Sequence, residues 1–158
     1  MINLNTWSPE RIKEYLTKQE EQYKAVEAKR KEKIVEQIEI FNDTANRLAP
    51  AIEYLFESNY NFTHPDLDVF SFRGPVLDYD AKNNLMYVYS EETRRVTRVD
   101  LYTEEATTIL NKDFFTYCNF DHVMKGLLYT LELHQRYIID CSDDIATRQE
   151  LIEKYRIN

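Results

Sequence analysis

The stretch from Ser8 to Phe56 constrains this chain more than any other, because its pattern predicts one very long amphipathic helix. Ser8 is a good N-cap, since its hydroxyl can accept a hydrogen bond from the first helical turn. Pro9 suits the first helical position, where its missing N–H costs nothing, and Glu10 faces the positive end of the helix dipole. The sequence therefore predicts a helix that begins at residue 8 or 9.

Pro50 interrupts this helical pattern. A proline inside a helix removes one backbone hydrogen bond and crowds the carbonyl four residues earlier. Kinks in helices usually arise at such a residue. We therefore expect a long helix over residues 8–49, a kink or break near Pro50, and a short helix over residues 50–58.

Apolar residues divide the long helix into two unlike halves. From residue 34 onward they recur at steps of four and three, which keeps one stripe on one helix face. This helix seam consists of Ile34, Ile38, Phe41, Leu48, Ile52 and Leu55, with Ala45 between them. Between Leu16 and Ile34 only Tyr23 and Val26 are sizeable apolar side chains. Because residues 8–49 would span roughly 60 Å, we expect the first half to project from the body or to lie on a partner.

The chain beyond the long helix predicts a small sheet followed by two helices. Alternating apolar and polar residues with intervening turns favour an antiparallel meander of three or four strands over residues 69–102. Helical spacing returns over residues 121–156, and residues 140–142 indicate a break between two helices. The fold class is α+β, with a long N-terminal helix kinked near Pro50, the meander and two C-terminal helices, all in a single domain of residues 1–158.

One face of the predicted meander is rich in tyrosine. A turn over residues 91–94 places Tyr87 opposite Arg98 and Tyr89 opposite Val96, while methionine and valine occupy the other face. Tyrosine and arginine are enriched at interface hot spots. The candidate binding residues are therefore Tyr79, Tyr87, Tyr89, Arg98 and Tyr102. The alternative is that the Met/Val face meets the helices and the Tyr/Arg face is an ordinary half-solvated sheet surface.

The charge of the chain is acidic and uneven. The formal net charge is −8, of which residues 1–60 carry −2 (nine Lys/Arg, eleven Asp/Glu) and residues 61–158 carry −6 (eleven Lys/Arg, seventeen Asp/Glu). Such a surface argues against direct binding to nucleic acid, because phosphates attract basic proteins and repel acidic ones. An acidic surface could instead imitate nucleic acid and occupy a basic cleft of another protein, although a solvated acidic face is the commoner case.

The N-terminus and the cysteines bear on location. Residues 1–5 have neither the basic region nor the apolar region of a secretory signal, and no run approaches the length of a membrane span. Two cysteines without a secretory context are usually free thiols. We therefore expect a cytoplasmic protein that does not enter a membrane and has no disulfide between Cys118 and Cys141.

Two short motifs, Pro65-Asp66 and Asp80-Ala81-Lys82, provide the one resemblance to a known family. Together they resemble the signature of the PD-(D/E)xK nucleases. The resemblance implies that Asp66 and Asp80 would bind Mg²⁺ and that Lys82 would place the attacking water or stabilise charge at phosphorus. The chain departs from the family because Asp80 and Lys82 fall beside Asn83 in a predicted hairpin loop instead of inside a strand.

Other constellations predict no catalysis, cofactor or metal site. Cys118 and His122 stand four residues apart, but no third group completes a nucleophile set and no second pair completes a zinc site. The only glycines are Gly74 and Gly126, which excludes a glycine-rich phosphate loop. We expect Cys118 to be a partly buried thiol and His122 to be part of a helix cap.

These observations favour a non-enzymatic protein that binds another protein, or a second copy of itself, through the long helix. The Tyr/Arg sheet face would be a second contact. A small acidic binder of this kind could be an inhibitor of a nucleic-acid-processing enzyme, such as phages and mobile elements encode. The alternatives are a Mg²⁺-dependent nuclease that uses Asp66, Asp80 and Lys82, and a structural subunit of a homo-oligomeric coiled-coil assembly.

Overall fold

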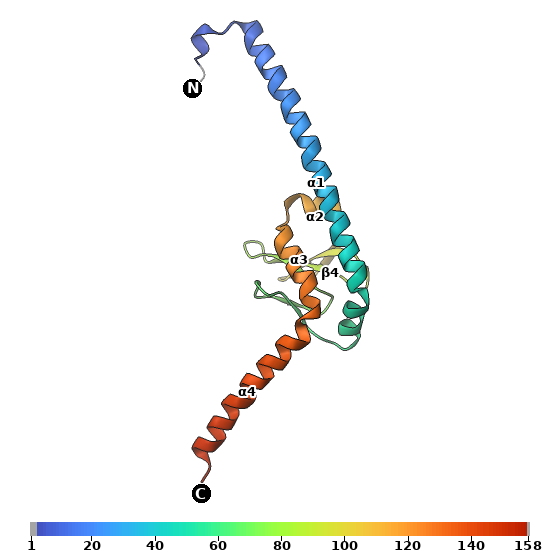
Figure 1. Ribbon diagram of the computed structural model, residues 1–158, viewed down its shortest axis with the longest axis vertical. Coiled ribbons are helices and arrows are strands. Elements are labelled where there is room, and N and C mark those ends of the chain that lie inside the picture. Colours follow the sequence, from blue (N-terminus) through green and yellow to red (C-terminus); the bar gives the residue numbers. More distant parts are fainter. Residues whose placement is uncertain (1–2, 158) are drawn as a thin grey trace.

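The computed structural model describes residues 3–157 and has the predicted α+β architecture (Figure 1). The helices are α1 (Pro9–Glu57), α2 (Asn111–Tyr117), α3 (Phe120–Leu128) and α4 (Leu133–Tyr155), with 3-10 turns η1 (Leu4–Thr6) and η2 (Tyr129–Leu131). The strands are β1 (Phe62–Thr63), β2 (Phe70–Ser71), β3 (Val76–Asp80), β4 (Leu85–Tyr89), β5 (Val96–Asp100) and β6 (Ala106–Thr108). A small body sits at the middle of the molecule, and α1 and α4 extend from it in opposite directions (Figure 1).

Helix α1 runs unbroken through Pro50, which corrects the expectation of a separate short helix over residues 50–58. Its start is as predicted, because the Ser8 hydroxyl accepts a hydrogen bond of 3.2 Å from the Arg11 amide. Leu48 and Ile52 are both buried on either side of the proline. Packing on both sides of Pro50 therefore keeps the backbone helical despite the missing hydrogen bond, and the helix curves instead of ending (Figure 1).

The two halves of α1 differ as their apolar patterns predict. The seam enters the core of the body, where the fully buried residues of α1 are Phe41, Ala45, Leu48, Ile52 and Leu55. Ile34 and Ile38 are partly buried at the edge of the same core. Tyr23 and Val26, by contrast, are each 65% exposed. The N-terminal half of α1 therefore projects from the body, as the sequence predicts.

Two antiparallel sheets form the β part of the body. The larger has the order β3-β4-β5-β6, and Tyr87 pairs with Arg98 and Tyr89 with Val96, as predicted. The meander nevertheless differs from the predicted residues 69–102. It begins at β3 and ends with β6, which pairs with β5 beyond residue 102. The stretch near residue 70, expected in the meander, pairs with β1 in a separate two-stranded sheet.

The tyrosine-bearing side of the larger sheet faces the helices, contrary to the alternative that the Met/Val face would do so. Tyr89 and Val96 are buried in the main core, and the Tyr89 ring lies 5.8 Å from that of Phe41 on α1. The opposite face has its own smaller core. That core consists of Val76, Met86, Val88 and Val99, covered by Leu67, Val69, Tyr79 and Leu101. Each face of the sheet is therefore covered, one by helices and one by loops.

Helix α3 lies close against β3 because residue 126 is a glycine. A Cβ at Gly126 would come within 1.9 Å of the Val76 carbonyl oxygen and 2.7 Å of the His64 ring. The N-cap of α3 is Asn119, whose side chain accepts a hydrogen bond of 3.2 Å from the His122 amide. Backbone contact between helix and sheet thus depends on the missing side chain at residue 126.

The break between the C-terminal helices lies at η2 and Glu132, not at residues 140–142 as expected. Leu133 is buried immediately after this turn and anchors the start of α4 in the core. Further along, ion pairs one helical turn apart join Arg136 to Asp140 and Arg148 to Asp144 at 3.2 and 2.6 Å. These pairs favour helix on both sides of residues 140–142, which explains why α4 continues through them.

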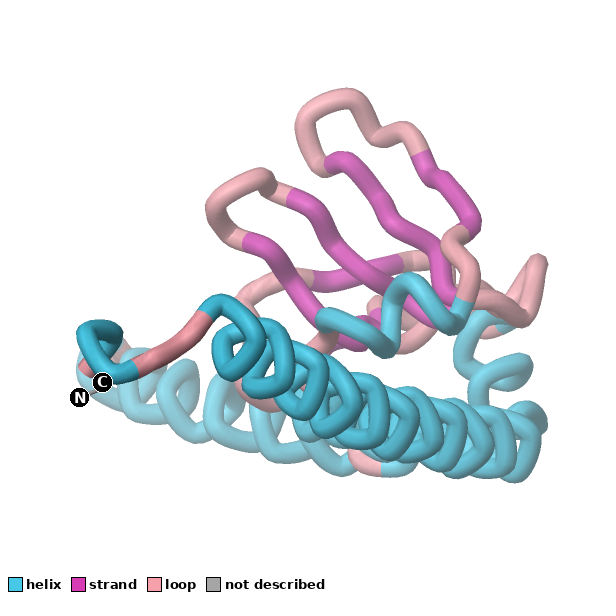
Figure 2. The backbone as a smooth tube through the Cα atoms, turned by 90° about the horizontal axis from the view of Figure 1, so that it is seen from above, coloured by secondary structure: helices cyan, strands magenta, loops and turns pink. Residues whose placement is uncertain are grey.

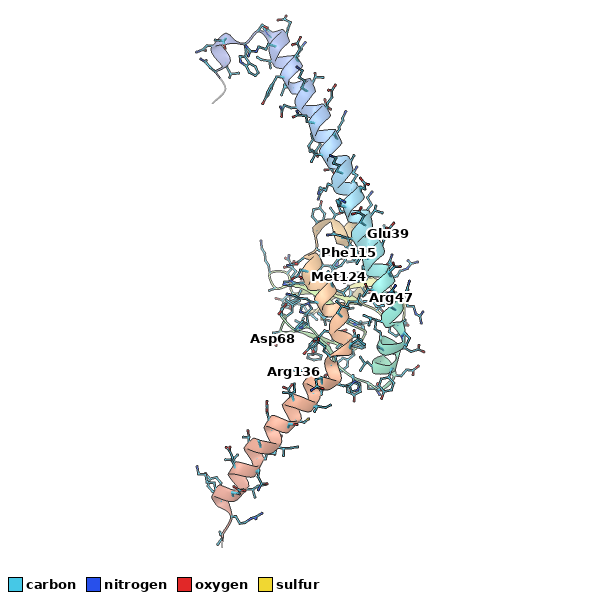
Figure 3. All side chains as sticks on the ribbon, viewed as in Figure 1. Glu39, Arg47, Asp68, Phe115, Met124 and Arg136 are labelled. Carbon is cyan, nitrogen blue, oxygen red and sulfur yellow. The ribbon has the colours of Figure 1, made fainter. Side chains whose placement is uncertain are left out.

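Only the first turns of α4 contact the body. The Tyr137 hydroxyl donates a hydrogen bond of 2.9 Å to the Asn61 carbonyl, and the His134 ring lies 4.6 Å from the Tyr60 ring. From Ile138 to Tyr155 the side chains are exposed. The helices lie on one side of the molecule and the larger sheet on the other (Figure 2). Phe115 and Met124 lie within the body, whereas Glu39 and Arg47 lie on the outer side of α1 (Figure 3).

Trp7 packs against the first turns of α1. Trp7 is half-buried, and its ring lies 5.1 Å from the Tyr15 ring. The Arg11 guanidinium lies 4.7 Å from the centre of the Trp7 ring. Both cysteines are free; Cys118 is half-buried, as predicted, and Cys141 is exposed. Among the described residues no helix combines the length and apolar character that crossing a membrane requires.

Candidate functional site

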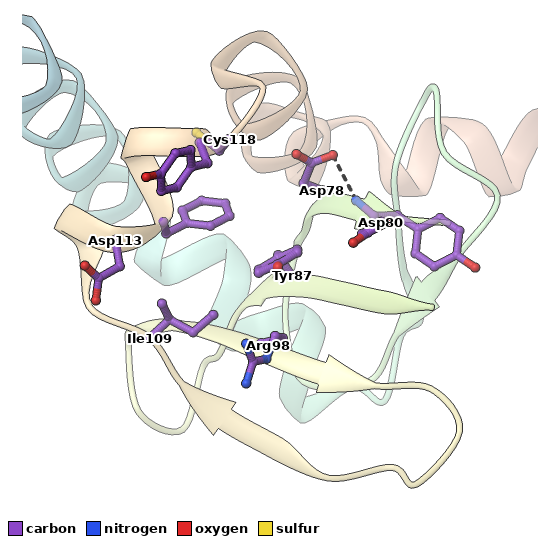
Figure 4. A pocket seen from close by; sticks show the side chains of 10 residues that line it. Asp78, Asp80, Tyr87, Arg98, Ile109, Asp113 and Cys118 are labelled. Carbon is purple, nitrogen blue, oxygen red and sulfur yellow. Dashed lines mark hydrogen bonds between the residues drawn. The ribbon is translucent and has the colours of Figure 1, made fainter. Parts of the chain in front are cut away.

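A cleft of about 440 Å³ opens between the Tyr87 side of the larger sheet and helix α2 (Figure 4). Its lining residues are Asp78, Tyr79, Asp80, Tyr87, Arg98, Ile109, Asp113, Phe114, Tyr117 and Cys118. Three aspartates and one arginine give this lining a formal charge of −2. We call it the acidic cleft, and its lining includes three of the five residues of the predicted Tyr/Arg patch, Tyr79, Tyr87 and Arg98.

Aromatic side chains form the apolar part of the acidic cleft. The Tyr87 ring is half-buried and lies 5.2 Å from the Phe114 ring of α2. Phe114 itself belongs to the main core, so it holds Tyr87 in place. Tyr117, at the end of α2, is 88% exposed. The cleft thus has one rigid aromatic wall and one exposed aromatic residue at its mouth.

Asp78 and Asp80 are held in place by local hydrogen bonds. One Asp78 oxygen accepts a hydrogen bond of 2.9 Å from the Tyr79 amide and lies 3.5 Å from Nδ1 of His122. Asp80 accepts hydrogen bonds from the Lys82 and Asn83 amides and from the Asn83 side chain. These bonds, with that of the Asn83 side chain first, lower the pKa of Asp80, which keeps this carboxylate charged.

Arg98 and Asp113 are the charged groups of the cleft that remain available. Both are exposed, and neither forms an ion pair with another side chain within residues 3–157. With Asp78 and Asp80 nearby, the balance of charge in the cleft favours a cationic group. The aromatic faces of Tyr87 and Tyr117 would favour the same kind of group through cation–π contact.

The thiol of the acidic cleft is unsuited to nucleophilic chemistry. Burial, and after it the negative charge of Asp78, raise the pKa of Cys118 to about 11. A nucleophilic cysteine needs the opposite shift, because the thiolate is the reactive form. His122 directs Nδ1 toward Asp78, and its amide is capped by Asn119. The expectation of a partly buried thiol and a capping-region histidine is therefore met.

A second histidine, His64, is buried behind β3 and has a structural role. Its Nε2 donates a hydrogen bond of 2.7 Å to the His122 carbonyl, and its Nδ1 accepts one of 3.0 Å from the Asp66 amide. Only the neutral ring can donate from one nitrogen and accept at the other. Burial lowers the pKa of His64, which also favours the neutral form. His64 thus joins the loop before β2 to helix α3.

The structure separates the residues of the predicted Tyr/Arg patch. Tyr87 and Arg98 line the acidic cleft, but Tyr89 lies in the main core. Tyr79 borders the cleft but also packs against the core of the opposite face, because the register of β3 shifts between Val76 and Asp78. Tyr102 lies in the turn after β5 and is 79% exposed. The five residues therefore do not form one continuous patch.

The residues that resemble a nuclease signature occupy two different local structures. The Asp66 carboxylate lies 3.5 Å from the Lys125 ammonium of α3. Asp80 ends β3 and caps the following turn, which contains Lys82. Within residues 3–157 no three His, Cys, Asp or Glu side chains are grouped closely enough to hold a metal ion. The geometry thus gives the resemblance no support.

Two helical segments form the other candidate surface. We call residues 9–33 of α1 the α1 arm and residues 138–155 of α4 the α4 arm. On the α1 arm, Leu16 and Tyr23 lie seven residues apart on the face that continues the seam, and both are exposed. The exposed apolar residues of the α4 arm are Ile138, Ile139, Ile145, Leu151, Ile152 and Tyr155. Three of its isoleucines recur at intervals of seven, the spacing of a coiled-coil contact position.

The helix seam itself is not an external surface. Phe41, Leu48, Ile52 and Leu55 are all buried inside the chain's own body. A partner therefore cannot contact them in the folded protein, and the surface open to a partner is the continuation of the stripe along the α1 arm. This difference between core and arm is visible in Figure 3, where the side chains of both arms point into open space.

The sequence-based interpretation missed Asp78 and Asp113 as members of the cleft. Asp113 belongs to helix α2, which lies between the predicted meander and the predicted C-terminal helices. Asp78 faces the same side as Tyr87 only because of the register shift in β3. An aspartate alternating with tyrosine in a strand was the available signal, but it does not reveal where a bulge lies.

Comparisons with known proteins supply no family for this chain. Neither a protein-family model nor any of the curated proteins or solved structures compared with it is a match. The acidic cleft and the two arms are therefore the features from which a function must be argued.

Proposed function

We propose that this protein is a non-enzymatic binding protein whose two arms dock on another protein chain. The observation that carries the proposal is the row of exposed apolar side chains on both arms, including Tyr23 at 65% and Ile145 at 66% exposure. Single exposed apolar residues are normal on a protein surface. A row of them at heptad spacing on a projecting helix is instead typical of a helix that packs against another helix.

The charge of the chain supports a protein as the partner. A net charge of −8 disfavours contact with nucleic acid, whose phosphates repel an acidic surface. The arms also combine apolar and charged residues in the manner of helices that pair in water, with an ion pair of 3.3 Å between Glu20 and Lys24. Such pairs support a solvated helix while its apolar face remains free for contact.

The acidic cleft is the proposed second contact. Its charge of −2 and its aromatic wall suit the lysine or arginine side chain of a partner that already rests on the arms. Asp113 would pair with the basic group, and Tyr87 would contact its apolar stem. A partner held at an arm and at the cleft would bind more tightly than through either contact alone.

The proposal is tested by photo-crosslinking in the native host. A benzoylphenylalanine residue replaces Tyr23 in one variant and Ile145 in another. Matched controls carry it at Glu21 and Glu150, which lie on the polar sides of the same arms. We expect covalent adducts with a protein from the two apolar positions and none from the two controls.

The outcome of the crosslinking separates docking from chance collision. Adducts of equal yield from apolar and polar positions, or no adducts from any position, would overturn the proposal. A third variant, Asp113→Arg, tests the cleft. Reversing this charge should weaken adduct formation, and because residue 113 is exposed the protein should stay folded.

A further inference from the structure

We infer that the chain docked on the arms is a second copy of this protein, and that the α1 arm of each copy pairs with the α4 arm of the other. This inference rests on the proposed function, because it identifies the partner of the same surface. The two arms of each pair would be antiparallel. The two-fold axis would lie between the two copies, level with the middle of each. Each dimer would then contain two identical arm-to-arm contacts.

Charge complementarity is the first argument. Residues 24–33 of the α1 arm contain five Lys/Arg and two Glu, a net charge of +3. Residues 140–153 of the α4 arm contain five Asp/Glu and one Arg, a net charge of −4. Pairing α1 with α1, or α4 with α4, would bring like charges together. Pairing α1 with α4 brings opposite charges together and so favours the mixed contact.

Apolar complementarity is the second argument. Leu16 and Tyr23 are separated by seven residues on the α1 arm, as are Ile145 and Ile152 on the α4 arm. Matching heptad positions allow the two rows to interdigitate over the same length. Without a partner chain, both rows remain in water, where exposure of each apolar side chain is unfavourable.

The geometry of the chain is compatible with a closed dimer. At 1.5 Å per residue the α4 arm is about 27 Å long and the α1 arm about 37 Å, so one can cover most of the other. Both arms belong to the helical side of the molecule, with the larger sheet on the opposite side (Figure 2). A second copy facing that side would meet the helices while its own sheet points away.

Two-fold symmetry also brings the acidic segment of each α4 arm next to the basic segment of the other copy's α1 arm. In an antiparallel pair, the part of α4 that leaves one body lies beside the part of α1 that enters the other body. That places Asp140, Asp143 and Asp144 near the basic stretch that ends at Lys33. The strongest charges of each arm therefore meet near the centre of the dimer.

The inference is tested by sedimentation equilibrium of the full chain under reducing conditions, which prevent disulfides through the exposed Cys141. We expect the wild-type protein to be a dimer. The α1-arm variant Leu16→Glu/Tyr23→Glu and the α4-arm variant Ile145→Glu/Ile152→Glu should each weaken the dimer by about 100-fold or more. A control with glutamates at exposed positions away from these rows and outside the basic stretch, Thr17→Glu/Thr147→Glu, should remain dimeric.

Mixing the two arm variants is the decisive measurement. In a mixed dimer, one of the two contacts pairs an unchanged α1 arm with an unchanged α4 arm. The mixture should therefore dimerise more strongly than either variant alone. Contacts between like arms cannot be restored in this way, so a mixture that stays monomeric would overturn the inference.

A monomeric wild-type protein would also overturn the inference, whatever happens to the proposed function. Crosslinking of Tyr23 or Ile145 to a different protein would then show that the arms still bind a partner. Failure of both experiments would remove the proposed function as well. Circular dichroism of each variant confirms that the exposed substitutions leave the body folded.

Discussion

The body and the arms of this molecule are built from the same kind of helix, but the apolar side chains are buried in the body and exposed on the arms. Residues 34–57 of α1 place a dense apolar stripe in the core, whereas residues 9–33 of the same helix carry fewer apolar residues, which lie in water. No turn or cap separates the two parts. The comparison shows that continuous helical geometry says little about burial, which depends on how closely the apolar residues follow one another along one face.

The largest expected difference between body and arm concerns stability. Phe41 is 1% exposed, and its ring contacts Phe115 and Tyr89. Phe41→Ala should lower the free energy of unfolding by about 3–5 kcal/mol, because it removes buried surface and leaves a cavity. Tyr23→Ala on the arm should change it by less than about 0.5 kcal/mol when measured on dilute monomer. Urea denaturation compares the two, and similar losses would contradict the division into body and arm.

A smaller effect is expected at Pro50, inside the buried half of α1. Pro50→Ala should raise the free energy of unfolding by about 1–2 kcal/mol, because it restores a hydrogen bond to the Asn46 carbonyl. The gain is reduced because the unfolded chain loses the rigidity of proline. The matched arm change, Ala28→Pro, should reduce the helical circular dichroism signal without moving the urea midpoint. Loss of stability in Pro50→Ala would mean that the core requires the proline geometry.

The smallest expected effect is a pH dependence that belongs to the body alone. Burial lowers the pKa of His64 in the folded protein, with His122, Asp66 and Asp78 as the nearby titratable groups. The unfolded chain therefore binds the proton more readily, and folding stability falls as pH decreases below the ordinary histidine value of about 6.5. Urea midpoints at pH 7.5 and 5.5 measure this decline, which should be smaller in His64→Gln. An equal decline in the variant would assign the effect to other groups.

The fold was predictable where local patterns and packing agree. The long helix, its start at Ser8 and the pairing of Tyr87 with Arg98 follow from the sequence. The separate short helix expected after Pro50 and the break expected at residues 140–142 were wrong, because packing around Leu48 and Ile52 keeps α1 helical through the proline, and neighbouring ion pairs support α4. The actual break at η2 is set by the burial of Leu133, which local sequence does not reveal.

The candidate site was less predictable than the fold. Tyr87 and Arg98 were identified through strand alternation, but alternation alone could not show that Tyr89 would enter the core. The bulge in β3 turned Tyr79 toward the core of the other face and placed Asp78 in the cleft. Surfaces built from several elements depend on such shifts, and a shift of one residue reverses which side chains face the site.

The placement of Trp7 has a practical consequence for spectroscopy. It is the only tryptophan of the chain, and it rests against Tyr15 and Arg11 at the far tip of α1. Its fluorescence emission would report on that tip and would register little when the distant core melts. Because Trp7 is far from the core, it is also a native fluorescent label. Its emission wavelength and fluorescence polarisation should change when a partner binds at the tip of α1.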